Sequence, residues 1–309
     1  MYSSSFRILV LVVLFYHSFI NCRSTSKREL KMDKAKNELK PDYNKVQHVP
    51  LQDLRTIDMI PDLKTDGFTY VSKRHITGIE NMVEMSNEHK VALAEDSVKL
   101  VLELTGAKSA YVHSGGFRDL TSPDSAKSIP VIHSDMSPEG ATYIKGIVRD
   151  KFLRSKDSDK VKFGRYIKEG KKIAIVNVWR PIHTVQDNHL GICQWDSLVK
   201  EDAWKSNLIP NGGTSTAQAW RYREGQRWFY LDQQRTDEVY VFMQHDSAAP
   251  DGHGINVPHA SFELQKDKDK PWTRISFEAT VFAMMDSPTV SPLSEWSDYI
   301  VSRINRFIY

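Results

Sequence analysis

The stretch TRISFEATVFAMM, residues 273–285, is a largely apolar run of the kind that forms a β-strand. Comparable short runs fill the chain after Gly106, and Gly, Pro, Asn and Asp separate them as turn residues do. Strands that follow one another with few helices between them favour a sandwich or barrel of mostly antiparallel sheet. The other expected strands are residues 66–74, 109–114, 128–135, 171–182, 226–231 and 237–246.

Three segments predict helices that pack on this sheet. Apolar residues recur at helical spacing after Ser86, and Gly106 is a natural helix end. Residues 142–157 favour a helix inserted between strands. The last 18 residues, 292–309, carry an amphipathic stripe that predicts a C-terminal helix, made of Trp296, Ile300, Val301, Ile304, Phe307 and Ile308.

The first residues resemble a secretory signal peptide. Arg7 precedes the apolar stretch 8–16, which is shorter than the roughly 20 residues of a membrane span. We expect a signal peptide over residues 1–24, with a retained signal anchor as the alternative. A polar tail over 25–55 and one domain over 56–309 would follow. This predicts entry into the secretory pathway, as a secreted or lumenal protein without stable membrane association after cleavage.

Composition and cysteine usage narrow the function classes. The chain has 309 residues, of which 40% are hydrophobic and 26% charged, an ordinary globular balance. The formal charge of +3 is too small to argue for a nucleic-acid partner. Only Cys22 and Cys193 are present, and the apolar surroundings of Cys193 favour a buried thiol over a nucleophile.

Candidate metal ligands stand in VIHSDMSPEGA, residues 131–141. Side chains two apart on a strand point to the same face, so His133 and Asp135 could reach one ion, with a Pro-Glu-Gly turn after them. A site needs a third ligand, and His259, at the start of an expected strand, is the best candidate. His245 is the alternative. His183 and His189 are expected in a solvated loop.

A basic and a hydroxyl side chain follow this set. Arg274 and Ser276 lie two apart on one strand face. Two histidines and one carboxylate are the ligands of non-heme Fe(II) oxygenases, and they leave coordination positions open. A guanidinium pairs with a carboxylate through two parallel hydrogen bonds, so Arg274 with Ser276 could hold a dicarboxylate cosubstrate.

The ordered set resembles the 2-oxoglutarate/Fe(II)-dependent dioxygenases. It is most similar to the hydroxylase/desaturase family of secondary metabolism, which includes gibberellin-desaturase-like proteins. The resemblance covers roughly residues 60–285 and rests on motifs in a fixed order: TGAKSAYV (105–112), HSDMSPEGA (133–141), NVWRPI (177–182), QRWFYL (226–231), DEVYVFMQHDS (237–247), PHASFE (258–263) and RISFEATVF (274–282).

This resemblance implies a mainly β fold with flanking helices, a double-stranded β-helix or jelly roll. It also implies an enzyme that uses Fe(II), 2-oxoglutarate and O2 to hydroxylate or desaturate a small organic substrate. His133, Asp135 and His259 would bind iron, and Arg274 with Ser276 would bind 2-oxoglutarate. The alternatives are a non-catalytic jelly-roll binding protein and a methyltransferase-like or hydrolytic enzyme on the same scaffold.

Further polar residues extend the candidate cofactor site. Asn177 and Arg180 lie on an otherwise apolar strand, and we assign both to cofactor binding. Alternation sends Arg180 to the face opposite Asn177, which favours a structural ion pair, unless a bulge near Pro181 turns it into the cavity. Asp246 could orient a metal ligand or cap a strand end, and Arg118 could contact substrate.

Overall fold

The computed structural model describes residues 5–8, 46–79, 82, 84–204, 216–267 and 270–285. The predicted C-terminal helix and the greater part of the predicted signal peptide lie outside these residues. Strands lie at β1 (Ser5–Ile8), β2 (Gln47–Asp53), β3 (Phe68–Val71), β4 (Ser109–Asp119), β5 (His133–Ser134), β6 (Ile173–Pro181), β7 (His189–Cys193), β8 (Gln218–Ala219), β9 (Trp228–Tyr230), β10 (Val239–Asp246), β11 (His259–Phe262) and β12 (Ile275–Met284). The α-helices are α1 (Asn87–Thr105), α2 (Pro138–Leu153) and α3 (Ser158–Lys168).

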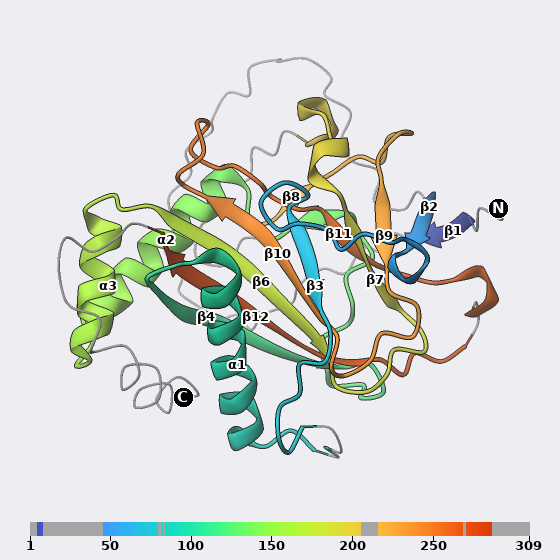
Figure 1. Ribbon diagram of the computed structural model, residues 1–309, viewed down its shortest axis with the longest axis horizontal. Coiled ribbons are helices and arrows are strands. Elements are labelled where there is room, and N and C mark those ends of the chain that lie inside the picture. Colours follow the sequence, from blue (N-terminus) through green and yellow to red (C-terminus); the bar gives the residue numbers. More distant parts are fainter. Residues whose placement is uncertain are drawn as a thin grey trace, which may run out of the picture.

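Two sheets form the body of the protein (Figure 1). The seven-stranded sheet has the order β1-β2-β9-β7-β11-β5-β8, and the five-stranded sheet has the order β3-β10-β6-β12-β4. All strand pairs are antiparallel except β2 with β9. The expected antiparallel β fold with flanking helices is confirmed, and every strand expected after residue 66 is present within its predicted range or close to it.

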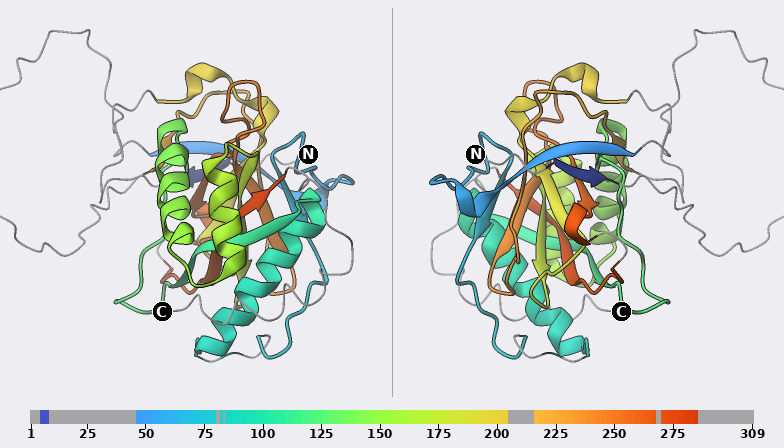
Figure 2. Two further views of the ribbon diagram at one scale, coloured as in Figure 1. Left: turned by 90° about the vertical axis from the view of Figure 1, so that its left-hand side faces the viewer. Right: turned by 90° about the vertical axis from the view of Figure 1, so that its right-hand side faces the viewer.

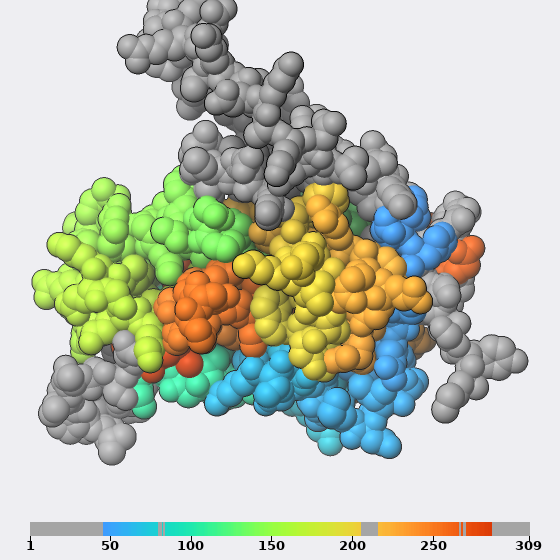
Figure 3. Space-filling model, turned by 90° about the horizontal axis from the view of Figure 1, so that it is seen from above, coloured from blue at the N-terminus to red at the C-terminus, as the bar shows by residue number. Residues whose placement is uncertain are grey.

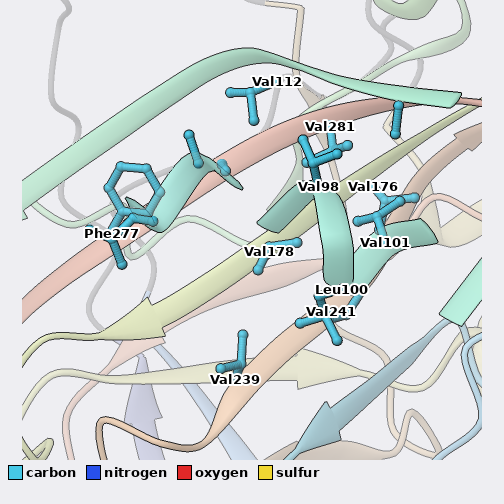
Figure 4. Close-up of a cluster of buried hydrophobic side chains, with 14 of the residues drawn as sticks. Val98, Leu100, Val101, Val112, Val176, Val178, Val239, Val241, Phe277 and Val281 are labelled. Carbon is cyan, nitrogen blue, oxygen red and sulfur yellow. The ribbon is translucent and has the colours of Figure 1, made fainter. Parts of the chain in front are cut away.

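Helix α1 covers one face of the five-stranded sheet (Figures 1 and 2). Ser86 caps its start, and Gly106, the predicted helix end, closes it in the left-handed conformation. Figure 4 shows the apolar core between this helix and the sheet. Val98, Leu100 and Val101 of α1 are buried there together with valines of β4, β6, β10 and β12.

The opposite face of the five-stranded sheet is covered by two different structures. Helices α2 and α3 pack through Phe152 and Phe163 on the half that holds the first residues of β6, Ile173 and Ile175. The seven-stranded sheet packs on the other half, where Phe229 and Ile192 lie in one cluster with Trp179. Position 177 of β6 therefore falls where the helical cover ends and the second sheet begins.

Several expectations are corrected. The Pro-Glu-Gly segment is the first turn of α2, because Ser137 caps the helix and Pro138 suits its first position. Helix α2 ends at Leu153, and a separate helix α3 follows it. The polar tail does not reach residue 55, since β2 begins at Gln47 and pairs with β9. His189 is buried on β7 rather than solvated in a loop.

The segment 247–257 folds back over the end of β10. Seen from above, it lies between the α2–α3 pair and the segment around residues 195–204 (Figure 3). Among the described residues, no helix is both long and apolar enough to span a membrane.

Candidate metal centre

Strand pairing brings the three predicted metal ligands together. His259 of β11 lies directly opposite His133 of β5, and Asp135 follows β5 by one residue. The Nε2 atoms of His133 and His259 lie 3.5 and 3.8 Å from Oδ1 of Asp135. Ligands that bind one ion at about 2.0–2.2 Å lie up to roughly 4 Å apart, so the three atoms fit a single metal. No other group of three acidic, histidine or cysteine side chains in the described ranges meets this condition.

Hydrogen bonds fix both imidazoles in the tautomer that a metal requires. Nδ1 of His133 lies 2.7 Å from the carbonyl of Val131, and Nδ1 of His259 lies 3.1 Å from the carbonyl of Val257. A carbonyl accepts only, so each Nδ1 carries a proton, and Nε2 is the nitrogen left to bind a metal. Such outer hydrogen bonds commonly orient histidine ligands in metal sites.

Asp135 is held from three sides. Its backbone N–H donates to Oε1 of Gln244 at 2.6 Å, and its carbonyl accepts from Oγ1 of Thr216 at 2.8 Å. Its Oδ2 accepts from Nδ2 of Asn177 at 2.5 Å. Gly140 permits this packing, because a Cβ there would lie 2.2 Å from the carbonyl oxygen of Thr216. The motifs did not single out Gln244, which lies within β10, or Thr216, which precedes β8, since one polar residue alone carries no spacing signal.

The electrostatics of the cluster suit a divalent cation. Burial, together with the nearby His133, lowers the pKa of His259 to about 4, which keeps this imidazole neutral. Burial opposes ionisation of Asp135, but the two histidines and Asn177 outweigh it and hold the pKa of Asp135 well below its usual range. For His133 burial also acts downward, and the hydrogen bond and charge of Asp135 outweigh it to raise the pKa. One anionic and two histidine ligands result.

Arg274, directly before β12, is buried with few partners. Its guanidinium donates to the carbonyl of Asn188 and lies 5.5 Å from the centre of the Trp179 ring. Its Nε is buried and has no hydrogen-bond partner among the described residues. Burial, and then the charge of Arg118, lowers the pKa of Arg274 to about 9. A buried cation with an unused donor fits a bound carboxylate.

Arg274 shares its strand face with two other polar residues. Ser276 follows it by two positions and is 1% exposed, and Glu278 follows Ser276 by two more. Burial, and then the charge of Asp135, raises the pKa of Glu278 to about 7. Glu278 was present in a predicted motif but not among the predicted site residues. The same alternation that selected Ser276 could have selected it.

Arg180 does not belong to the metal centre, and its prediction as a cofactor ligand is corrected. Its guanidinium donates to the carboxylate of Asp96 on α1 and to the carbonyls of Arg74 and Thr236. Strand β6 pairs regularly with β12 at Arg180 and Pro181, so no bulge turns the side chain around. Simple alternation places Asn177 toward Asp135 and Arg180 toward α1.

The remaining candidates lie outside the cluster. His245 contacts Lys145 and His253, through Nε2 at 2.9 Å and Nδ1 at 2.8 Å, so it is not a metal ligand here. Oδ1 of Asp246 accepts the N–H of Ala248 and caps the end of β10. Cys193 is buried, and burial raises its pKa to about 12, as expected for an inert thiol. The Arg118 guanidinium donates to the Lys127 carbonyl.

The comparisons with known proteins agree with this geometry. The chain is 27% identical over 252 residues to the alpha-ketoglutarate-dependent dioxygenase phiK of a fungal species (strain ATCC 74256), which covers 76% of this chain and 84% of the relative. It is 24% identical over 250 residues to the hydroxylase/desaturase CTB9 of Cercospora beticola, covering 73% and 72%.

The fold also matches solved structures. One is the iron and alpha-ketoglutarate-dependent endoperoxidase NvfI, with a TM-score of 0.60, 20% identity, and coverage of 79% of this chain and 87% of that one. This likeness confirms the predicted jelly roll. A family model described as "Oxidoreductase/YMDC permease-like domain" matches residues 17–284. The chain therefore belongs to the oxidoreductase/YMDC permease-like domain family, and the predicted kinship with 2-oxoglutarate/Fe(II)-dependent oxygenases is confirmed.

Proposed function

We propose that this protein is an Fe(II)- and 2-oxoglutarate-dependent oxygenase that hydroxylates or desaturates a small organic substrate. The observation that carries the proposal is the convergence of Oδ1 of Asp135 with the Nε2 atoms of His133 and His259, at 3.5 and 3.8 Å. Two imidazoles and one carboxylate leave coordination positions for a cosubstrate and O2. The names of the relatives favour this function over a binding protein, a transferase or a hydrolase.

The residues fit both cofactors. His133, Asp135 and His259 would hold Fe(II), and imidazoles whose Nδ1–H is held by a backbone carbonyl leave Nε2 for that ion. Arg274 would bind the distal carboxylate of 2-oxoglutarate through the guanidinium that the protein leaves partly unsatisfied, with Ser276 beside it. When bound, Fe(II), 2-oxoglutarate and O2 supply an oxidant that removes hydrogen from a C–H bond, while the keto acid becomes succinate and CO2.

The rest of the chain contributes orientation and exclusion of water. Gln244, Thr216 and Asn177 fix Asp135 before any metal arrives, and preorganised ligands lose little entropy on binding. The Trp179 ring beside Arg274 limits access of water to the guanidinium. A charged anchor in such surroundings binds a carboxylate more strongly than it would in water.

Anaerobic addition of Fe(II) and then 2-oxoglutarate tests this function. Wild-type protein is expected to develop the weak visible charge-transfer band of the ternary complex. His259→Ala is expected to abolish the band because it removes a metal ligand, and Arg274→Ala is expected to require much more 2-oxoglutarate. His183→Ala, an exposed histidine outside the cluster, is the control and should match wild type. A band that is unchanged in both site variants would refute the assignment.

We also propose that the protein enters the secretory pathway through residues 1–24. The support is the sequence alone: Arg7 before the apolar stretch 8–16, and small or polar residues after it. Loss of β1 with this segment would leave β2 paired with β9. Mass spectrometry of the N-terminus, after expression of the full chain in eukaryotic cells, would find a start between residues 22 and 25. An intact Met1 on protein recovered from the cytosol would contradict the proposal, whereas an intact Met1 on membrane-bound protein would favour the retained signal anchor.

A further inference from the structure

Asn177 is an unusual residue for its position. It lies in the middle of β6, where all nine residues from Ile173 to Pro181 are buried, and its own exposure is 0%. A buried amide is costly unless its donors are satisfied. Every other side chain of the strand except Arg180 is apolar. A polar residue there needs partners that justify its burial.

Those partners are two carboxylates. The single nitrogen Nδ2 of Asn177 donates to Oδ2 of Asp135 at 2.5 Å and to Oε1 of Glu278 at 2.9 Å. An amide nitrogen carries two hydrogens, so both bonds can form together. Asn177 therefore joins the metal-ligand carboxylate to an acid on the neighbouring strand β12.

The contact gives the two carboxylate oxygens of Asp135 different partners. Oδ2 is engaged by Asn177, whereas Oδ1 is the atom that faces Nε2 of His133 and of His259. A carboxylate that could rotate freely would exchange these oxygens. The hydrogen bond from Asn177 favours one rotation, in which Oδ1 alone is presented to the imidazoles.

Glu278 decides which end of the amide faces Asp135. The oxygen and nitrogen of an asparagine side chain can exchange places by a flip of the amide. With an acceptor oxygen on each side, the flip would set the amide oxygen against Oδ2 of Asp135 and Oε1 of Glu278, and the hydrogen bonds to both would be lost. Glu278 thus holds the nitrogen toward Asp135, and the Oδ1 atom of Asn177 is left buried without a hydrogen-bond partner among the described residues.

We propose that Asn177 and Glu278 are a positioning pair that fixes the Asp135 carboxylate so that Oδ1 alone is offered to the metal. This assigns Asn177 to the metal centre rather than to direct binding of 2-oxoglutarate. The inference rests on the proposed function for the identity of the metal. It concerns metal affinity and coordination, which can be measured without the unknown substrate.

Titration of the full chain with Co(II), followed by visible absorption, tests the pair. Loss of an outer hydrogen-bond partner typically weakens metal binding by roughly 10–100-fold, and this is the increase in Kd expected for Asn177→Ala. The Co(II) spectrum should also change, because Asp135 can then turn its second oxygen toward the ion. Glu278→Ala should weaken binding by a smaller factor. Glu278→Gln should stay near wild type, because its carbonyl oxygen still accepts from Asn177.

Gln234→Ala is the matched control. Gln234 is another buried amide, 2% exposed, and its Nε2 donates to the carbonyl of Glu238 at 2.9 Å, outside the metal centre. Its loss removes a comparable hydrogen bond and should leave the Co(II) affinity and spectrum unchanged. A merely structural role of Asn177 predicts that both alanine variants lose thermal stability and that neither changes the spectrum.

The outcomes separate this inference from the proposed function. Wild-type protein that binds neither Co(II) nor Fe(II) would overturn the function itself. Wild-type binding with equal affinity and spectrum in Asn177→Ala would overturn only the positioning pair. If Asn177→Ala does not fold, the comparison of Glu278→Ala with Glu278→Gln decides, because identical affinities in these two variants contradict the pair.

Discussion

Two buried arginines on neighbouring strands serve opposite purposes. Arg180 of β6 and Arg274, the residue before β12, are 3% and 4% exposed. Arg180 donates to the carboxylate of Asp96 and to two backbone carbonyls. Arg274 donates to one carbonyl, and no carboxylate lies within ion-pair distance of it in the ranges that the structure describes.

The difference shows how a functional charge differs from a structural one. Burial of a cation is expensive, and the hydrogen bonds and the carboxylate at Arg180 offset more of that cost than the single carbonyl at Arg274. Burial lowers the pKa of both, to about 10 for Arg180 and about 9 for Arg274. The partly unsatisfied guanidinium of Arg274 supports its proposed role in ligand binding, whereas the carboxylate partner of Arg180 supports a structural role.

The largest expected effect is a loss of folding stability when Arg180 loses its carboxylate partner. Asp96→Asn removes the charge that pairs with Arg180 and with Arg74, and breaking one side of a buried pair costs about 3–5 kcal/mol. Unfolding in urea should show this loss, while the affinity for 2-oxoglutarate stays at the wild-type value. Glu103→Gln is the control, because Glu103 pairs with Arg74 at 2.7 Å with 58% of its side chain exposed, and such pairs contribute little. Equal losses of stability in both variants would contradict the structural role assigned to the pair of Asp96 with Arg180.

The next largest expected effect is on the binding of 2-oxoglutarate by Arg274. Arg274→Met removes a charge-assisted contact worth about 1.5–3 kcal/mol, so the Kd of 2-oxoglutarate should rise roughly 10–150-fold. Removal of an incompletely paired buried charge should leave stability unchanged or raise it. Calorimetric titration of the Fe(II)-loaded protein under nitrogen measures the affinity, and Fe(II) binding itself serves as the control. A stability loss as large as that of Asp96→Asn would mean that Arg274 is structural.

The expected strands were predictable because each is a short apolar run between turn residues, as in 171–182 and 273–285. The two-residue spacings of His133 with Asp135 and of Arg274 with Ser276 were equally informative, since strand geometry fixes which side chains share a face. Strand β2 was not predicted, because Gln47–Asp53 is polar and gains its partner only from β9, far along the chain.

What the sequence could not provide was the environment of each polar side chain. Arg180 was assigned to the cofactor site because its partner, Asp96, lies on a helix whose docking no local pattern reveals. His189 was expected in a loop because its neighbours Asp187 and Asn188 are turn residues, yet β7 places it in the sheet. Gln244 and Thr216 orient Asp135 through contacts made across the fold.

A buried titratable group can also be kept neutral, as His245 is. The dependence of folding stability on pH tests this. Burial, and then the charge of Lys145, lowers the pKa of His245 from 6.5 to about 3. The unfolded chain therefore binds a proton below pH 6.5 that the folded chain does not bind until about pH 3, and stability falls as pH falls. Between pH 6.5 and 5 this costs about 2 kcal/mol. His245→Gln should flatten the urea-unfolding profile in this window, whereas exposed His183→Gln should not.

The smallest expected effect concerns Ser276, and it tests whether Ser276 and Arg274 bind the same carboxylate. A hydroxyl beside a charged anchor contributes one hydrogen bond, worth about 0.5–1.5 kcal/mol, so Ser276→Ala should raise the Kd of 2-oxoglutarate by roughly 2–13-fold. Exposed Ser114→Ala on β4 is the control. Because Ser276 can act only with a carboxylate already held by Arg274, its loss should have no added effect in the Arg274→Met background. Additive losses in the double variant would show that Ser276 binds elsewhere on the ligand, and the two residues would not form one anchor.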